Sequence, residues 1–114
     1  LTTIKTCFNE TGYLLDTHTA IGYGVLKQYQ QETGDHTKTV LLSTASPYKF
    51  PESVYQAIYG EELDVYTAID KLSEKTGVPV PQALAGIKER EVLHKEAIDK
   101  TEIISFIKSE IEAM

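Results

Sequence analysis

Two short segments carry the side chains whose types and spacing could do chemistry. Residues 16–19 read Asp-Thr-His-Thr ahead of an amphipathic pattern, so a carboxyl and an imidazole group would stand beside the free N–H groups of a helix start. Residues 43–47 read Ser-Thr-Ala-Ser-Pro and place three hydroxyl groups in a loop without bulky side chains. The first segment is equally consistent with an ordinary helix cap, and the second with an ordinary turn. Neither segment alone specifies a reaction.

Other arrangements of reactive side chains are weaker. The three histidines are scattered along the chain, so a metal site would require distant segments to converge. They are His18, His36 and His94. The single cysteine, Cys7, falls on the apolar side of a predicted helix, where free cysteine commonly behaves as a small buried hydrophobe. We therefore expect no metal site and a structural role for this cysteine.

A serine nucleophile is also disfavoured. A triad of Ser43 or Ser46 with His18 and Asp16 lacks the glycines that form a nucleophile elbow. Glycine-rich phosphate loops, C-x-x-C and H-E-x-x-H motifs are missing from the sequence as well. No residue of the chain is therefore predicted to be catalytic.

The composition indicates one acidic domain. The chain has 114 residues and a net charge of −6, enough for one hydrophobic core but not two. Its acidic balance disfavours nucleic acid and anionic membranes as partners, and it contains no apolar run of about 20 residues. An unpaired cysteine suits a reducing cytoplasm. The chain begins with Leu1 and has its only methionine at position 114, which suggests a piece of a longer protein.

Helical periodicity and capping residues predict six helices. Ser, Thr or Asp precedes several apolar patterns, and glycine follows most of them, as expected of helix starts and ends. The predicted helices run up to Gly12, from His18 to Gly34, from Pro51 to Gly60, from Asp64 to Gly77, from Pro81 through Ile87, and from Asp99 onward. Gly22 and Gly24 interrupt the second helix at a cost of about 1 kcal/mol each, which suggests close packing against backbone or a ligand, with simple tolerance of glycine as the alternative.

Two strands complete an α/β fold class. Residues 39–42 form a short apolar, partly β-branched run typical of a strand buried in a parallel sheet. Residues 91–98 alternate between apolar and polar residues and suggest an edge strand. Two such strands need neighbours, so either another polypeptide completes the sheet or the strand prediction is wrong. The unpaired strands and the isoleucine stripe of the last helix also suggest self-association of the fragment.

Two blocks of sequence, taken in order, resemble the carboxyl-terminal part of threonine synthase. Residues 10–22, ETGYLLDTHTAIG, are similar to the family pattern T-G-Y-x-x-D-P-H-T-A-V-G, and residues 42–52, LSTASPYKFPE, to L-S-T-A-H-P-A-K-F-P-E. Thr17 replaces the usual proline of this family and Ser46 the usual histidine. Residues 80–84 and the tail also follow the family layout. The resemblance implies that residues 1–114 are one helix-rich carboxyl-terminal segment of a larger two-domain enzyme of pyridoxal-phosphate fold type II.

The resemblance also implies an activity and a cofactor site. Threonine synthases convert O-phosphohomoserine and water into L-threonine and phosphate with pyridoxal 5'-phosphate. Thr44 matches the hydroxyl residue that faces the pyridine nitrogen, and Asp16 and His18 would lie near the cofactor as supporting or substrate-side residues. The Schiff-base lysine and the phosphate loop belong to an amino-terminal part with no counterpart here, and Lys49 is expected to be a surface lysine. The chain alone is therefore expected to be inactive.

Two alternatives remain open. The first is a free-standing helical binding or regulatory module, in which the same residues are caps and turns. The second is a pyridoxal-phosphate enzyme with another substrate. The mass of the source protein would separate the first from an enzyme segment, and titration with O-phosphohomoserine against other amino-acid phosphates would test the second.

Overall fold

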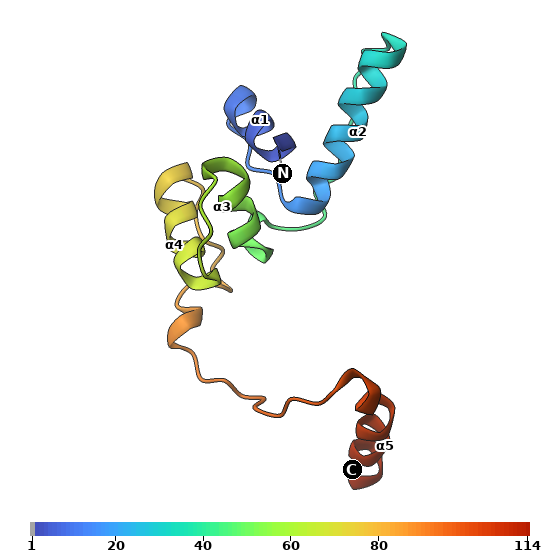
Figure 1. Cartoon of the computed structure of the whole chain (residues 1–114), viewed down its shortest axis with the longest axis vertical. Helices are drawn as coiled ribbons and strands as arrows, with labels where there is room; N and C mark the ends of the chain where they lie inside the picture. The colour runs from blue at the N-terminus through green and yellow to red at the C-terminus, as the bar shows by residue number, and fades with distance from the viewer. Residues whose placement is uncertain (1) are drawn as a thin grey trace.

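The computed structural model describes residues 2–114, which form a helical unit with a long carboxyl-terminal extension (Figure 1). The chain is far from compact: its radius of gyration is 18.9 Å and its extents are 60 × 33 × 23 Å, against about 13 Å for a compact chain of this length. Five α-helices and three short 3-10 helices occur in the described part. They are α1 (Thr2–Thr11), α2 (Thr17–Thr33), η1 (Pro47–Lys49), α3 (Pro51–Tyr59), α4 (Val65–Thr76), η2 (Ile87–Glu89), η3 (Lys100–Glu102) and α5 (Ile103–Ala113).

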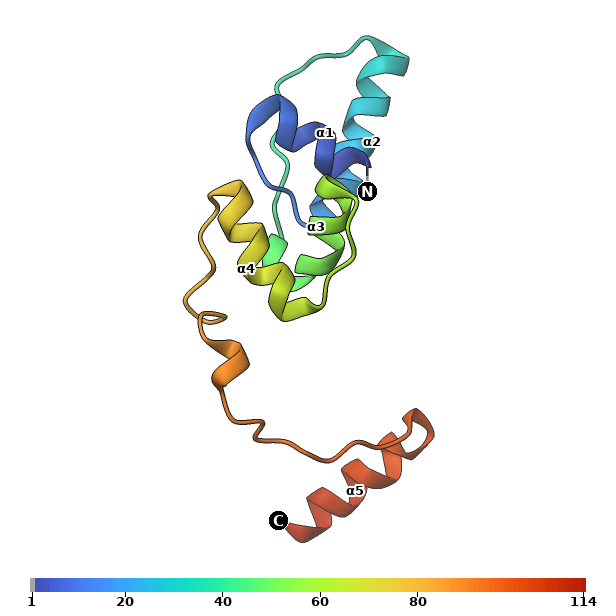
Figure 2. The same ribbon diagram turned by 60° about the vertical axis from the view of Figure 1, so that its left-hand side comes forward.

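The core lies among α1, α3 and α4. Helices α3 and α4 pack side by side, and α1 packs against both α3 and α2 (Figure 2). The side chains at the centre of this core are fully enclosed by their neighbours. They include Ile4, Leu15, Val54, Tyr55, Ala68 and Leu72. The helices that carry the motif segments are therefore held by one shared apolar core.

Local signals in the sequence place most helix boundaries correctly. Asp16 and Asp64 cap α2 and α4, and Asp99 with Glu102 forms the predicted capping box of the last helix. Gly34 and Gly60 adopt φ values of 69° and 77° directly after α2 and α3, a left-handed conformation that suits glycine. These boundaries depend on residues adjacent in sequence, which explains why they could be predicted.

The two predicted strands are not confirmed, and the described residues contain no strand at all. Residues 39–42 run as an irregular segment in which Val40 and Leu42 are 83% and 76% exposed, so the prediction of a strand buried on both faces is wrong. Residues 91–98 are irregular as well. A strand requires a partner to satisfy its backbone groups, and within residues 2–114 neither segment forms a ladder with another segment.

The sixth helix is also not confirmed. Pro81 is followed by turns and by the single 3-10 turn η2 instead of a helix through Ile87. Gly86 has a φ of 66°, and a left-handed residue at this point interrupts any right-handed helix. The described residues are thus all-helical, not α/β.

Gly22 and Gly24 are close to neighbouring segments, as expected. A Cβ atom at Gly22 would lie 3.1 Å from Cδ1 of Leu41, and one at Gly24 would lie 3.4 Å from Oγ1 of Thr3. Residues 39–42 therefore lie directly against α2. The contact at Gly22 involves the far end of a partly exposed leucine, which has room to turn aside.

We expect Gly22→Ala to raise the free energy of unfolding by up to about 1 kcal/mol, because alanine restricts the unfolded chain and favours the helix. Thermal unfolding followed by circular dichroism measures the change. Gly24→Ala, with an ordinary contact distance, is the matched control and should stabilise by at least as much. A large loss of stability in Gly22→Ala alone would show that Leu41 cannot move.

Candidate functional site

The start of α2 is organised around the buried carboxylate of Asp16. This side chain is 2% exposed and accepts hydrogen bonds from the backbone N–H groups of His18, at 2.8 Å, and Thr19, at 3.0 Å. The hydroxyl of Thr19 donates a further bond to its second oxygen. Burial raises the pKa of this carboxyl, but the bonds from Thr19 and His18 outweigh burial and hold the pKa below its ordinary value. Asp16 therefore acts as an ionised cap.

His18 points away from the core and lies between the two motif segments. Its side chain is 58% exposed, with Nδ1 3.8 Å from Oδ1 of Asp16. Its ring centroid lies 5.8 Å from that of Phe50, the residue that precedes α3. The imidazole group is thus free to meet a ligand while Asp16 and Phe50 restrict its position.

Residues 39–46 run along α2 in the direction opposite to the helix. Leu41 contacts Gly22, and further along the segment Ser43 lines a hollow of about 230 Å³ together with Thr19 and Cys7. This path brings Thr44 toward the amino-terminal end of α2. Within residues 2–114, the hydroxyl of Thr44 is exposed and has no hydrogen-bond partner.

The segment after Thr44 is anchored by a cap and a buried aromatic residue. The Ser46 hydroxyl accepts from the backbone N–H of Tyr48 at 3.2 Å and caps η1. Tyr48 is buried and its hydroxyl donates to the carbonyl oxygen of Val78 at 2.5 Å. Burial raises the pKa of this phenol, so it stays a neutral donor. The loop that carries Thr44 is thereby tied to the end of α4.

Sequence reasoning identified Asp16, His18 and Thr44 but missed the residues that position them. The structure brings Asp16 and His18 into contact and runs the Thr44 segment past the same helix start. Tyr48 and Phe50 provide the anchoring contacts. The sequence feature that could have pointed to Tyr48 and Phe50 is the presence of two aromatic residues just after Pro47 in the second motif segment.

The remaining candidate side chains have structural positions. Cys7 is buried, as predicted, with Sγ 3.6 Å from the Thr11 hydroxyl, and Lys49 is exposed. The Ser46 hydroxyl caps η1, a structural role that differs from that of a serine nucleophile. In the described part of the chain, no three metal-binding side chains gather at one place. Among residues 2–114, no helix combines the length and apolar character needed to cross a membrane.

Comparison with known proteins gives one result. A family model described as threonine synthase, C-terminal, matches residues 19–107. The match covers more than half of the chain and includes Thr44, whereas Asp16 and His18 lie just before it. No curated protein matches the sequence.

Proposed function

Since the chain belongs to the family of threonine synthase carboxyl-terminal segments, we propose that residues 1–114 are one such segment of a larger two-domain enzyme. Threonine synthases are pyridoxal-phosphate-dependent lyases of threonine biosynthesis. The enzyme proposed here converts O-phosphohomoserine and water into L-threonine and phosphate. The observation that carries the proposal is the exposed, unbonded hydroxyl of Thr44 inside the matched range, on a loop held against the start of α2.

Thr44 fits the pyridine nitrogen of the cofactor. A threonine hydroxyl donates one hydrogen bond and has no negative charge, so it supports an unprotonated ring nitrogen. A carboxylate at this place would instead favour the protonated ring. When bound, pyridoxal phosphate supplies an electron sink for carbanionic chemistry. The part of Thr44 is to orient the ring through Oγ1 and to leave the nitrogen without a proton.

Asp16 and His18 support the same site from the start of α2. All the hydrogen bonds of Asp16 described above are directed to its own helix, so its contribution is to fix the first turn of α2, from which His18 projects. His18 presents an exposed imidazole group, which suits the substrate side of the site. The exposed Lys49 is on the surface beside Phe50 and is given no role in forming a Schiff base.

We expect the 114-residue polypeptide alone to be inactive, because it has no segment resembling the Schiff-base lysine motif or the phosphate loop of the family. Mixing it with pyridoxal phosphate should give no visible absorbance band of cofactor joined to a specific lysine, and no phosphate release from O-phosphohomoserine. Pyridoxal phosphate with free lysine is the control for non-specific reaction. A stoichiometric band accompanied by turnover would refute the expectation.

The partners and location follow from the same proposal. We place the protein in the cytoplasm, with its one cysteine reduced and buried, the remainder of its own polypeptide as its first partner, and neither nucleic acid nor membrane as a ligand. The alternative of a free-standing helical module is favoured by one observation: α1, α3 and α4 share a core of their own. The intact mass of the source protein distinguishes the two, since a module requires a chain near 12.7 kDa.

A further inference from the structure

An apolar groove lies between α4, η1 and the turns that follow Pro81. It has a volume of about 520 Å³ and is lined by Tyr66 and Ile69 from α4 and by Leu84 and Ile87 from the turns that follow. A second hollow, of about 270 Å³, shares these four side chains. The two hollows form one apolar depression, which we call the α4 groove.

Charged side chains of opposite sign border the two hollows. Lys49 lines the larger hollow, whereas Asp70 and Glu89 line the smaller one together with Lys88. The α4 groove is therefore apolar along its floor, with a basic side chain in one hollow and an excess of one acidic side chain in the other. A helix suited to it needs an apolar stripe with one acidic and one basic flank.

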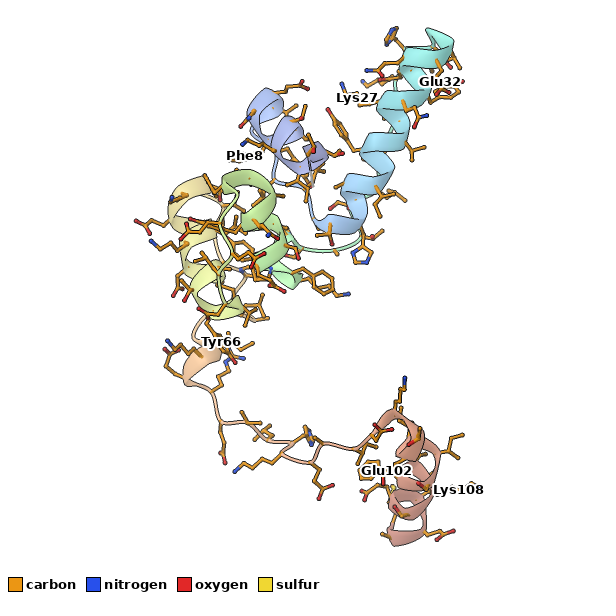
Figure 3. All side chains as sticks on the ribbon, viewed as in Figure 1. Phe8, Lys27, Glu32, Tyr66, Glu102 and Lys108 are labelled. Carbon is orange, nitrogen blue, oxygen red and sulfur yellow. The ribbon has the colours of Figure 1, made fainter. Side chains whose placement is uncertain are left out.

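Helix α5 has this pattern and lies unpacked in the structure. Its isoleucines at positions 103, 104, 107 and 111 are all exposed and share one face at about 100° per residue. Glu110 and Lys108 fall on opposite flanks of that face. Of the structured elements in residues 2–114, only η3 packs substantially against α5. Figure 3 shows Lys108 on this separate helix. It also shows Tyr66, in the first turn of α4, near the place where the carboxyl-terminal extension begins.

We propose that the α4 groove binds helix α5 of a second copy of this chain. The isoleucine stripe covers Ile69, Leu84 and Ile87, while Glu110 faces Lys49 and Lys108 faces the acidic hollow. The proposal does not depend on the enzymatic function. It assigns an occupant to the α4 groove and to the exposed isoleucine face of α5.

The path of the chain favours a second copy over the chain's own helix. Residues 90–99 run as an irregular tether that carries α5 away from the α4 groove (Figure 1). Fully extended, ten residues span about 33 Å. Two copies that exchange their α5 helices fill both grooves at once and close a twofold dimer, the commonest symmetry among oligomers.

A cysteine pair tests the contact directly. In the double variant Leu84→Cys and Ile107→Cys of the 114-residue chain, mild oxidation should give a dimer-sized band on a non-reducing gel. Either single variant is the control, since the proposed contact does not place two copies of the same position together. A cross-linked product that stays monomer-sized would show that α5 folds back on its own groove and would overturn the proposal. So would the absence of any cross-link in a variant with native helical content.

Charge exchange provides a second test that leaves the core untouched. Lys49→Glu and Glu110→Lys should each weaken the dimer about threefold or more in sedimentation equilibrium, because each places like charges together. The double variant should recover most of the loss, and Lys5→Glu on α1 is the matched control for a change in net charge. Two outcomes would count against the proposed contact. One is a wild-type chain that stays monomeric at about 100 μM, a concentration within the range of weak association. The other is a double variant whose loss of dimer affinity equals the sum of the losses in the two single variants.

Discussion

Replacing Asp16 with alanine is expected to lower the free energy of unfolding by about 2–4 kcal/mol, a large part of the stability of a domain this small. The loss combines the removal of a helix cap, about 1 kcal/mol, with the cost of leaving the buried donors around Asp16 without acceptors, about 1–3 kcal/mol. Urea unfolding followed by circular dichroism measures the change.

Asp64→Ala is the matched control for this substitution. Asp64 caps α4 with the same pattern, accepting from Tyr66 and Thr67 at 3.1 Å, but it is exposed and water can replace it. Its loss should be clearly the smaller of the two. Equal losses in both variants would show that the burial of Asp16 adds nothing to its role as a cap.

The same carboxylate makes stability depend on pH. Because the pKa of Asp16 lies lower in the folded chain than in the unfolded chain, its contribution is complete above its ordinary value near 3.8 and is lost as the pH falls through the lower folded value. Hydrogen bonds also lower the pKa values of the carboxyls of Asp35, Asp64 and Asp99, so part of the acid sensitivity is independent of Asp16. Asp16→Asn should therefore flatten the loss of stability between neutral pH and about pH 3 without abolishing it. An unchanged slope would contradict the role assigned to the ionised carboxylate.

The second large effect concerns Thr44 in the larger enzyme that we propose contains this segment. Thr44→Val keeps the shape of the side chain and removes the hydroxyl, so the pyridine nitrogen would lose its proposed donor. Leaving this neutral acceptor without its donor costs about 1–3 kcal/mol, which corresponds to a fall in kcat of about fivefold to 150-fold. Thr44→Ser should stay within a few-fold of wild type, because serine retains the donor.

Ser43→Ala is the neighbouring control for Thr44. The Ser43 hydroxyl donates to the backbone carbonyl of Ala45 at 3.4 Å and is not expected to meet the cofactor, so kcat should change little. The absorbance spectrum of bound cofactor gives a second readout, which should shift in Thr44→Val and not in Ser43→Ala. If Thr44→Val were fully active with an unchanged spectrum, Thr44 would not be the partner of the ring nitrogen.

The sequence predicted the cap at Asp16 from residue type and local order, and the structure confirms it. Thr44 was singled out only by the family resemblance, and its role stays a prediction. The contacts that place them, Leu41 on Gly22 and His18 beside Phe50, join residues about 20 to 30 positions apart. Such pairs depend on how the chain packs.

By itself, the sequence determined the helices α1 to α4, the capped start of the last helix and the membership of the chain in its family, because caps, glycines and motif segments act over a few neighbouring residues. Only the tertiary structure decided that residues 39–42 lie irregularly along α2 and that the isoleucine face of α5 lies uncovered. A strand and a buried helix face both need a partner surface distant in sequence. An apolar pattern shows that a residue favours burial, but it does not contain the partner that would bury it.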